Sequence, residues 1–520
     1  MPQDCWVQIL EQLSPPDAAS VVATSRDLQV SAESSLYRHV KIDWIKPPLK
    51  RVLTLFRVIH ERPDLAFQIH HLSMIPSRLE YPAEDQMRKW KPPQIDGDWS
   101  QLSFSFQNEV NVARNIITKV QFPSPAKWIH ALENGDPYAF VAVLLSQLHN
   151  LQSLQLDYTF VWQSGFPGLM MRHALLSAPK NLISRFAELS IVEYGMNVPQ
   201  SRVFHELGAP FIDAFPPCDS EQFAGWFYLP SLRSLEIWLQ SLNGVKNELL
   251  SKPAGSSKLR HLARLKRLVL AESPLEECEV RDLLFHLHSL KSLHLGLVYP
   301  SQDRELGWSE ASARPPLKEA GVLIEGLMSV KDTVEHLSVG MELCPLYYPS
   351  TWSSYNRDNG DPKESFKNCL GILKHFQLLK SAEIPSVMLL GWTIGDAPPM
   401  SEVLPQNLQK LIIRDQLIQS EDYEMDDDVV TVAIRDFLPS VQARTPLLDT
   451  IMLRSFWAGT GKGSPGGNDH AKELRIISEE LGLDTEICKV SSNISLGLWT
   501  TQRELHEASH FDYRYMQGQG

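Results

Sequence analysis

The residues best suited to chemistry form a glycine-rich stretch late in the chain, Gly461-Lys-Gly-Ser-Pro-Gly466. Its GxGxxG spacing is that of loops whose glycines let the backbone approach a pyrophosphate at a helix N-terminus. Such loops belong to an early βαβ unit, whereas this stretch follows an apolar strand expected at residues 451–453. A connecting loop is the simpler interpretation, and an enzyme that uses this loop remains an alternative.

Acidic and histidine clusters make no stronger case for catalysis. Residues 421–428 include six acids but lack the internal glycine and distal glutamate of a calcium loop, so we expect a solvated loop. His286 and His288 have no second ligand pair at zinc-like spacing, and neither GxSxG nor HExxH occurs. We therefore expect no catalytic residues, no metal and no cofactor, and a protein that acts by binding.

Composition narrows the class of partner. The chain has 520 residues, 43% of them hydrophobic and 21% charged, with a formal net charge of −13. This charge argues against a general nucleic-acid binder, which needs a clustered positive surface. No apolar run is long enough to cross a membrane, no secretory signal is evident, and the six cysteines form no CxxC pair. These features predict an intracellular protein with free thiols, in the cytoplasm, the nucleus or both.

The elements that must position any binding residues are indicated by a repeated leucine pattern, LxxLxL. Four good copies occur, at residues 151–156, 232–237, 265–270 and 290–295. Looser copies occur at residues 69–74, 186–191, 334–339, 408–413 and 448–453, with a doubtful tenth at 379–384. The final LxL of each copy is typical of a short strand with two buried side chains. Stacked units of this kind make a continuous core behind a parallel sheet.

Helix-capable stretches lie between these strands, and they predict an α/β fold. We expect helices at residues 48–61, 139–148, 275–287, 318–330, 363–376 and 429–442. From residue 154 onward the copies are 25 to 46 residues apart, which mostly exceeds the spacing of regular leucine-rich repeats. The good copies also lack the Asn or Cys that forms an internal ladder in standard repeats. The prediction is an irregular, leucine-rich-repeat-like horseshoe of parallel strands backed by helices.

The first forty residues differ from the rest. Trp6, Ile9, Leu10 and Leu13 follow the i, i+3, i+4, i+7 spacing of one helix face. Two prolines at residues 15 and 16 then end that helix, and two further short helices are expected up to residue 40. Three short helices bury little area, so this unit needs something to pack against. One interpretation is that its apolar residues form the ordinary core of a helical cap.

A second interpretation is that residues 1–40 bind a partner, because they resemble an F-box. The resemblance rests on Met1-Pro2, Cys5 to Leu10, Asp17, Thr24-Ser25-Arg26 and Leu36-Tyr37-Arg38-His39-Val40. Residues 53–74 resemble the segment that joins the F-box to irregular leucine-rich repeats in many filamentous-fungal proteins. The expected domains are an F-box at residues 1–40, a helical linker or cap at 41–66, the repeat domain at 67–500 and a tail at 501–520.

The resemblance implies a substrate-recruiting subunit of an SCF-type cullin-RING ubiquitin ligase. The F-box would bind a Skp-type adaptor, and through it the cullin, while the repeat domain would hold a client protein. The adaptor-binding residues expected from it are Pro2, Trp6, Ile9, Leu10, Leu13, Leu36 and Tyr37. The alternative from another class is a non-degradative interaction protein that binds the adaptor outside a ligase.

The client surface is expected on the sheet face opposite the buried leucines. The residues between and after the two leucines alternate to that face and should form columns across stacked strands. One predicted column is Gln155, Ser190, Glu236, Val269, His294, Ser338, Ile412 and Met452. The other is Asp157, Val192, Trp238, Ala271, Gly296, Gly340, Arg414 and Arg454.

Five residues of this region are the predicted client-binding residues. Trp238, next to Arg267 and His294 on adjacent strands, has the composition of a binding hot spot. An inserted loop that covers Trp238 is the alternative, because the long intervals supply such loops. Arg414 and Arg454 would suit an acidic or phosphorylated client, although solvated surface arginines are an equal alternative.

Overall fold

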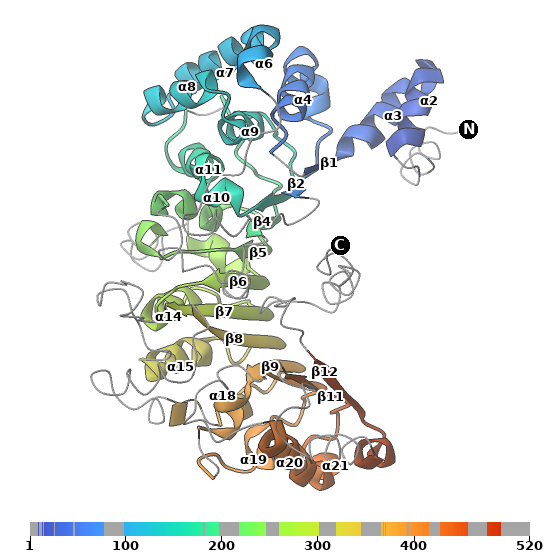
Figure 1. Ribbon diagram of the computed structural model, residues 1–520, viewed down its shortest axis with the longest axis vertical. Coiled ribbons are helices and arrows are strands. Elements are labelled where there is room, and N and C mark those ends of the chain that lie inside the picture. The colour runs from blue at the N-terminus through green and yellow to red at the C-terminus, as the bar shows by residue number, and fades with distance from the viewer. Residues whose placement is uncertain are drawn as a thin grey trace, which may run out of the picture.

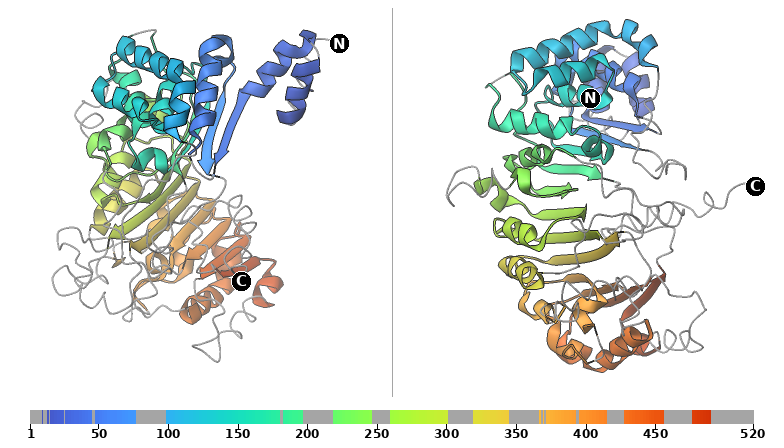
Figure 2. Two further views of the ribbon diagram at one scale, coloured as in Figure 1. Left: turned by 45° about the horizontal axis from the view of Figure 1, so that its top comes forward. Right: turned by 60° about the vertical axis from the view of Figure 1, so that its left-hand side comes forward.

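A single curved sheet organises the chain in the computed structural model (Figure 1). The structure describes residues 9, 13, 15–24, 26–44, 47–76, 98–179, 182–196, 218–245, 259–300, 319–344, 366–367, 369, 371–392, 395–414, 427–455 and 476–489. Helices line the outer side of the sheet, and the strands face the inner side (Figure 2). This confirms the predicted α/β class, with parallel strands backed by helices.

The sheet has 12 strands in the described ranges, arranged in the order of the chain, and every neighbouring pair is parallel. The strands are β1 His39–Trp44, β2 His71–Pro76, β3 Ser153–Asp157, β4 Ile191–Met196, β5 Ser234–Ile237, β6 Arg267–Ser273, β7 Ser292–Pro300, β8 His336–Cys344, β9 Ser381–Pro385, β10 Lys410–Arg414, β11 Thr450–Ser455 and β12 Asp484–Lys489. The first strand begins at His39, inside the segment that the sequence assigned to the N-terminal unit.

The leucines of the repeated pattern form the core, as predicted. Leu235, Leu268 and Leu293 are register partners on β5, β6 and β7, and all three are buried. A fully buried leucine stabilises the fold by about 1.5–3 kcal/mol relative to an exposed one. Even the doubtful copy at residues 379–384 forms a strand, β9, with Ala382 and Ile384 buried.

The predicted register of β4 was wrong. The sequence placed its buried pair at Leu189 and Ile191, whereas the strand buries Val192 and Tyr194, and Ile191 is exposed. Glu193, rather than Ser190, is therefore the register partner of Gln155 and belongs to the first predicted column. Val192 faces the core and does not belong to the second.

The helices pack on the outer side of the sheet, close to where the leucine spacing predicted them. The α-helices are α2 Pro15–Thr24, α3 Arg26–Arg38, α4 Leu49–Glu61, α5 Pro63–Ala66, α6 Trp99–Ser105, α7 Gln107–Val120, α8 Pro125–Glu133, α9 Pro137–Leu145, α10 Thr159–Trp162, α11 Phe166–Leu176, α14 Glu277–Leu284, α15 Ala320–Ser329, α18 Ser386–Leu390, α19 Met400–Val403, α20 Asp427–Phe437 and α21 Val441–Arg444. Short 3-10 helices occur at η2 Ser220–Tyr228, η3 Leu259–Arg264, η5 Ile372–His375 and η6 Leu438–Ser440. Only η5 replaces an expected α-helix, the one at residues 363–376.

Two glycines let one pair of outer elements approach closely. A Cβ at Gly168 of α11 would lie 2.3 Å from the backbone oxygen of Gln222 in η2. A Cβ at Gly225 of η2 would in turn lie 2.5 Å from the backbone nitrogen of Arg172 in α11. Neither distance is possible for a real side chain, so only glycine permits this backbone contact.

A backbone ladder runs through the residues directly before β6 to β10. The amide of Lys291 donates to the carbonyl of Lys266, that of Glu335 to Lys291, that of Lys380 to Glu335 and that of Gln409 to Lys380, each at 2.8 Å. The turns therefore satisfy their own polar groups through the main chain.

Candidate interaction surface

A groove lies on the inner face of the sheet, opposite the buried leucines. It has a volume of about 550 Å³ and is lined by residues from β6 to β11 and from the turns before them. Its outer row is set by strand register and consists of Arg267, Ser292, His336, Ser381, Lys410 and Thr450. The second row, two residues further along each strand, is Val269, His294, Ser338, Glu383, Ile412 and Met452.

The sequence predicted part of this surface. Arg267 and His294 both line the groove. From β6 onward the second row matches the first predicted column, except that the prediction had no member on β9, where Glu383 stands. His336, Lys410 and Ser381 were missed. Each precedes the second apolar residue of its LxxLxL copy, and that position faces the groove because it lies two residues before the row that was recognised.

Glu383, in the second row, forms an ion pair with Arg414 of the neighbouring strand β10. The guanidinium of Arg414 contacts Glu383 Oε1 through Nε at 2.7 Å and through Nη2 at 2.5 Å. Ser338 donates its hydroxyl to Glu383 Oε2 at 3.1 Å. Arg414 and Glu383 are only 5% and 8% exposed. Arg414 therefore holds a groove residue in place instead of facing a client, which corrects its predicted role.

Two other carboxylates near the groove also have cationic partners, whereas Asp449, which lines the groove, accepts a hydrogen bond from the Thr450 hydroxyl at 2.8 Å. Arg267 Nη2 lies 3.3 Å from Glu236 on β5. At the rim, Glu335 contacts Lys291 at 2.5 Å and Lys380 at 2.6 Å. Hydrogen bonds from these two lysines lower the pKa of Glu335 to about 2. These pairings leave the groove with little unbalanced negative charge.

The surroundings of His336 favour its neutral form. Desolvation lowers the pKa of this side chain below its usual range, and the neighbouring Lys291 and Lys380 act in the same direction while Glu335 opposes them. A neutral imidazole still offers one N–H donor to a ligand. Its position between Arg267 and Lys410 makes it a donor in the middle of the row.

Trp238 is completely buried, so the predicted hot spot is wrong at this residue. β5 ends at Ile237, and the Trp238 ring packs 5.7 Å from Trp162 of α10 and 6.2 Å from Phe223 of η2, between ring centroids. Secondary-structure elements cover it, and replacing it would damage the core. Asp157, from the same predicted column, is also completely buried, and burial raises its pKa to about 7.

The predicted adaptor-binding residues are only partly described. Ile9 is helical and 43% exposed, and Leu13 is half-buried. Leu36 is half-buried, and Tyr37 packs against the edge of the main core. Tyr37 therefore contributes to the junction with the sheet. Pro2, Trp6 and Leu10 lie outside the described residues.

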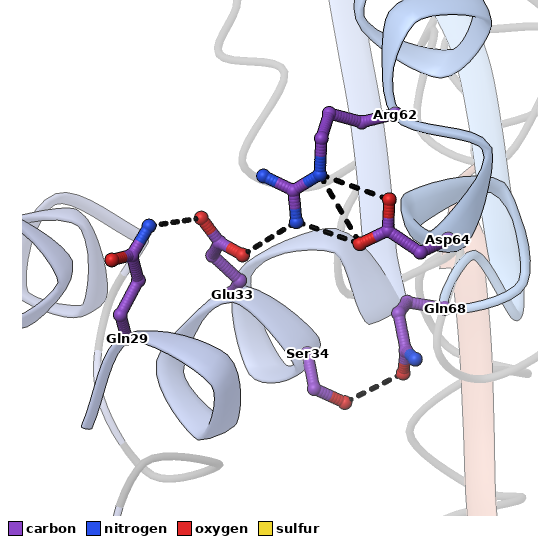
Figure 3. A network of polar contacts seen from close by, with 6 residues as sticks. All are labelled: Gln29, Glu33, Ser34, Arg62, Asp64 and Gln68. Carbon is purple, nitrogen blue, oxygen red and sulfur yellow. Dashed lines mark hydrogen bonds and ion pairs between the residues drawn. The ribbon is translucent and has the colours of Figure 1, made fainter. Parts of the chain in front are cut away.

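A polar network joins the N-terminal helices to the sheet domain (Figure 3). Arg62, just before α5, contacts Glu33 of α3 at 3.0 Å and Asp64 at 2.6 Å. Ser34 of α3 donates to Gln68 at 2.8 Å, and Gln29 donates to Glu33 at 2.9 Å. The helices α2 and α3 project from the end of the sheet (Figure 1), and this network links α3 to the segment around α5.

The remaining chemical candidates lie mostly where the structure gives no description. The loop at Gly461, the acidic residues 421–426 and the side chain of Arg454 lie outside the described part. Within that part, no three His, Cys, Asp or Glu side chains come together as metal ligands would. None of the described helices has the length and apolar character of a bilayer span. Cys218, Cys278 and Cys369 are free thiols.

Comparison with known proteins adds no assignment to this geometry. The chain matches no protein-family model, and no curated protein is similar to it. The candidate interaction surface is thus defined by its own contacts: a mixed-charge groove on the inner face, at a distance from an exposed apolar residue on the N-terminal helices.

Proposed function

We propose that this chain is a substrate-recruiting F-box subunit of an SCF-type ubiquitin ligase. Its N-terminal helices bind a Skp-type adaptor, and its groove holds a client protein. The chain has no part in the transfer chemistry. It acts by positioning, which raises the effective concentration of the client near the transfer enzyme.

The main support is the resemblance of residues 1–40, together with the 43% exposure of Ile9, one of the residues that the resemblance assigns to the adaptor interface. Single exposed apolar residues are common on protein surfaces, so the weight of this observation comes from the position of Ile9 in the segment that resembles an F-box. The contacts of Arg62 with Glu33 and Asp64 add to this, because they join the N-terminal helices to the sheet domain at a defined place. A positioning role needs such a joint.

The proposal is tested with Ile9→Asp and Leu10→Asp in a pull-down with a purified Skp-type adaptor. A charge placed in an apolar interface costs several kcal/mol, so we expect adaptor binding to be lost. Phe104→Asp on α6 is the matched control, because Phe104 is 88% exposed and lies outside the N-terminal helices. This control should bind the adaptor like the parent chain.

Two results bear on the competing functions. Adaptor binding by folded Ile9→Asp and Leu10→Asp proteins would contradict the F-box assignment. Recovery of the adaptor without a cullin, and without ubiquitylated clients, would favour a non-degradative interaction protein instead. The first result comes from the pull-down with purified adaptor, and the second from purification of the parent chain from cells.

A further inference from the structure

We propose that the groove binds an acidic peptide segment in a polyproline II conformation, with carboxylate or phosphoryl groups at every third residue. This inference rests on the proposed function for its biological role, since the segment would belong to the client. The binding chemistry itself depends only on the groove.

The first observation is an alternation along the outer row of the groove. From β6 to β11 the row reads Arg267, Ser292, His336, Ser381, Lys410 and Thr450. Two cationic residues, Arg267 and Lys410, and the imidazole of His336 between them therefore occupy every second strand, and a hydroxyl residue occupies each strand between. All six side chains line the same groove. A ligand that crosses the strands meets a cation or an imidazole at regular intervals.

The second observation is the length of that interval. Neighbouring strands are about 4.8 Å apart, so every second strand is about 9.6 Å away. A polyproline II peptide rises about 3.1 Å per residue and has three residues per turn. Its side chains thus return to the same face about every 9.3 Å. An extended β-peptide repeats its faces about every 6.6 Å instead, which does not match.

The third observation is the charge of the groove. Three carboxylates around it are each engaged by a cation: Glu383 by Arg414, Glu335 by two lysines and Glu236 by Arg267. A fourth, Asp449, lines the groove beside Thr450 and accepts a hydrogen bond from its hydroxyl, so the acids of the ligand must lie along the Arg267 to Lys410 part of the row. Lys410 makes no ion pair within the described residues. The whole chain has a net charge of −13, so an acidic ligand is repelled elsewhere and accepted here.

The remaining groove residues suit the backbone of such a peptide. A polyproline II segment makes no internal hydrogen bonds, so its amides and carbonyls need outside partners. The hydroxyls of Ser292 and Ser381 stand between the basic residues and offer both donors and acceptors. Val269 and Ile412, in the second row of the groove, offer apolar side chains that the prolines of the peptide can contact.

The test measures binding of fluorescent peptides to the purified full-length chain by anisotropy at low salt. One peptide has three glutamates spaced three residues apart in a proline-rich frame, and a second has phosphoserines there. A third has the same composition as the first, with glutamates two residues apart. We expect the third to bind about tenfold more weakly than the first, because only one of its acids can meet the row at a time.

Variants test whether the preference for the three-residue glutamate spacing depends on the outer row of the groove. Lys410→Ala should weaken binding of the first peptide severalfold, whereas Lys119→Ala on α7 removes the same charge outside the groove and should change nothing. Exchanging two residues, Ser381→Lys with Lys410→Ser, keeps the net charge and breaks the alternation. We expect this variant to lose the preference for the first peptide over the third.

The outcomes separate this inference from its alternatives and from the proposed function. Equal affinity for the two glutamate peptides would overturn the inference. Efficient competition by oligothymidylate would overturn it too, because it would show that the groove binds the phosphate backbone of a nucleic acid. Tighter binding of the phosphoserine peptide than of the glutamate peptide would identify phosphoryl groups as the preferred acids. The assay contains no adaptor, so its result is independent of the Ile9→Asp pull-down.

Discussion

Replacing Arg414 with Met should destabilise the C-terminal part of the sheet more than any other removal of a single charge near the groove. Arg414 is 5% exposed and neutralises Glu383, which is 8% exposed, through contacts of 2.5 and 2.7 Å. Removal of one partner leaves the other charge buried and unpaired, at a cost of about 3–5 kcal/mol. That is a large share of the roughly 5–15 kcal/mol that stabilises a typical domain.

Amide hydrogen exchange is the suitable assay, because a repeat array can open locally without unfolding as a whole. A loss of about 3–5 kcal/mol corresponds to an increase in exchange of roughly 100-fold or more for the amides of β9, β10 and β11. Lys410→Met on the same strand is the control, since Lys410 makes no ion pair among the described residues. Its exchange should stay within a few-fold of the parent chain.

The double variant Glu383→Leu with Arg414→Met completes the reasoning. Apolar replacement of a buried ion pair is often neutral, so this variant should recover most of the lost protection. If Arg414→Met exchanged no faster than Lys410→Met, the pair would contribute little and the groove floor would not depend on it.

Two further predictions concern the N-terminal half of the sheet and its outer helices. His71 stacks on His39 with ring centroids 4.2 Å apart, and desolvation, followed by the charges of His39, His70 and Arg38, lowers its pKa to about 4. Its folded pKa lies below the unfolded value of 6.5, so its contribution is full above pH 6.5 and is lost as the pH falls towards 4. Urea unfolding at pH 7 and pH 5 should show a smaller loss of stability in His71→Asn than in the parent, and equal losses would count against this assignment. Gly168→Ala should lower stability by about 1–3 kcal/mol, because its Cβ would meet the Gln222 backbone. Gly321→Ala on α15, where a Cβ meets nothing within 4 Å, should instead raise stability by about 0.5–1 kcal/mol, and similar melting shifts in both variants would contradict the packing argument.

The leucine pattern predicted most of the sheet, because burial of two aliphatic side chains per strand leaves a clear trace in the sequence. It failed at β4, where two overlapping phases both satisfy it: residues 186–191 and residues 189–194. The strand adopts the second phase because Tyr194 packs well in the core. Its ring centroid lies 4.6 Å from that of Trp226, and its hydroxyl donates to Gln222 Oε1 at 2.5 Å. Nothing in the local sequence reveals those distant partners.

The N-terminal elements and the binding surface were predicted less well than the strands of the repeat domain. β1 alternates Val40, Ile42 and Trp44 without leucine, so the repeat search passed over it. The helix α7 shows a clear apolar face at Val110, Ala113, Ile117 and Val120, and could have been predicted from its spacing. Trp238 was assigned to the surface because its strand was expected to continue. Where a strand ends depends on the helix packed beyond it, which strand periodicity cannot show.

The order of the strands fixes the distance along the sheet between the N-terminal helices and the groove. Each strand pairs only with its neighbours in the chain, so length accumulates in equal increments from the N-terminal helices towards the groove. From β1 to β8 there are seven steps of about 4.8 Å, or about 34 Å along the curve. Gain or loss of one unit during evolution would move the groove by one increment and leave its residues unchanged. The distance between the N-terminal helices and the groove can therefore change in evolution without a change in the residues that line the groove.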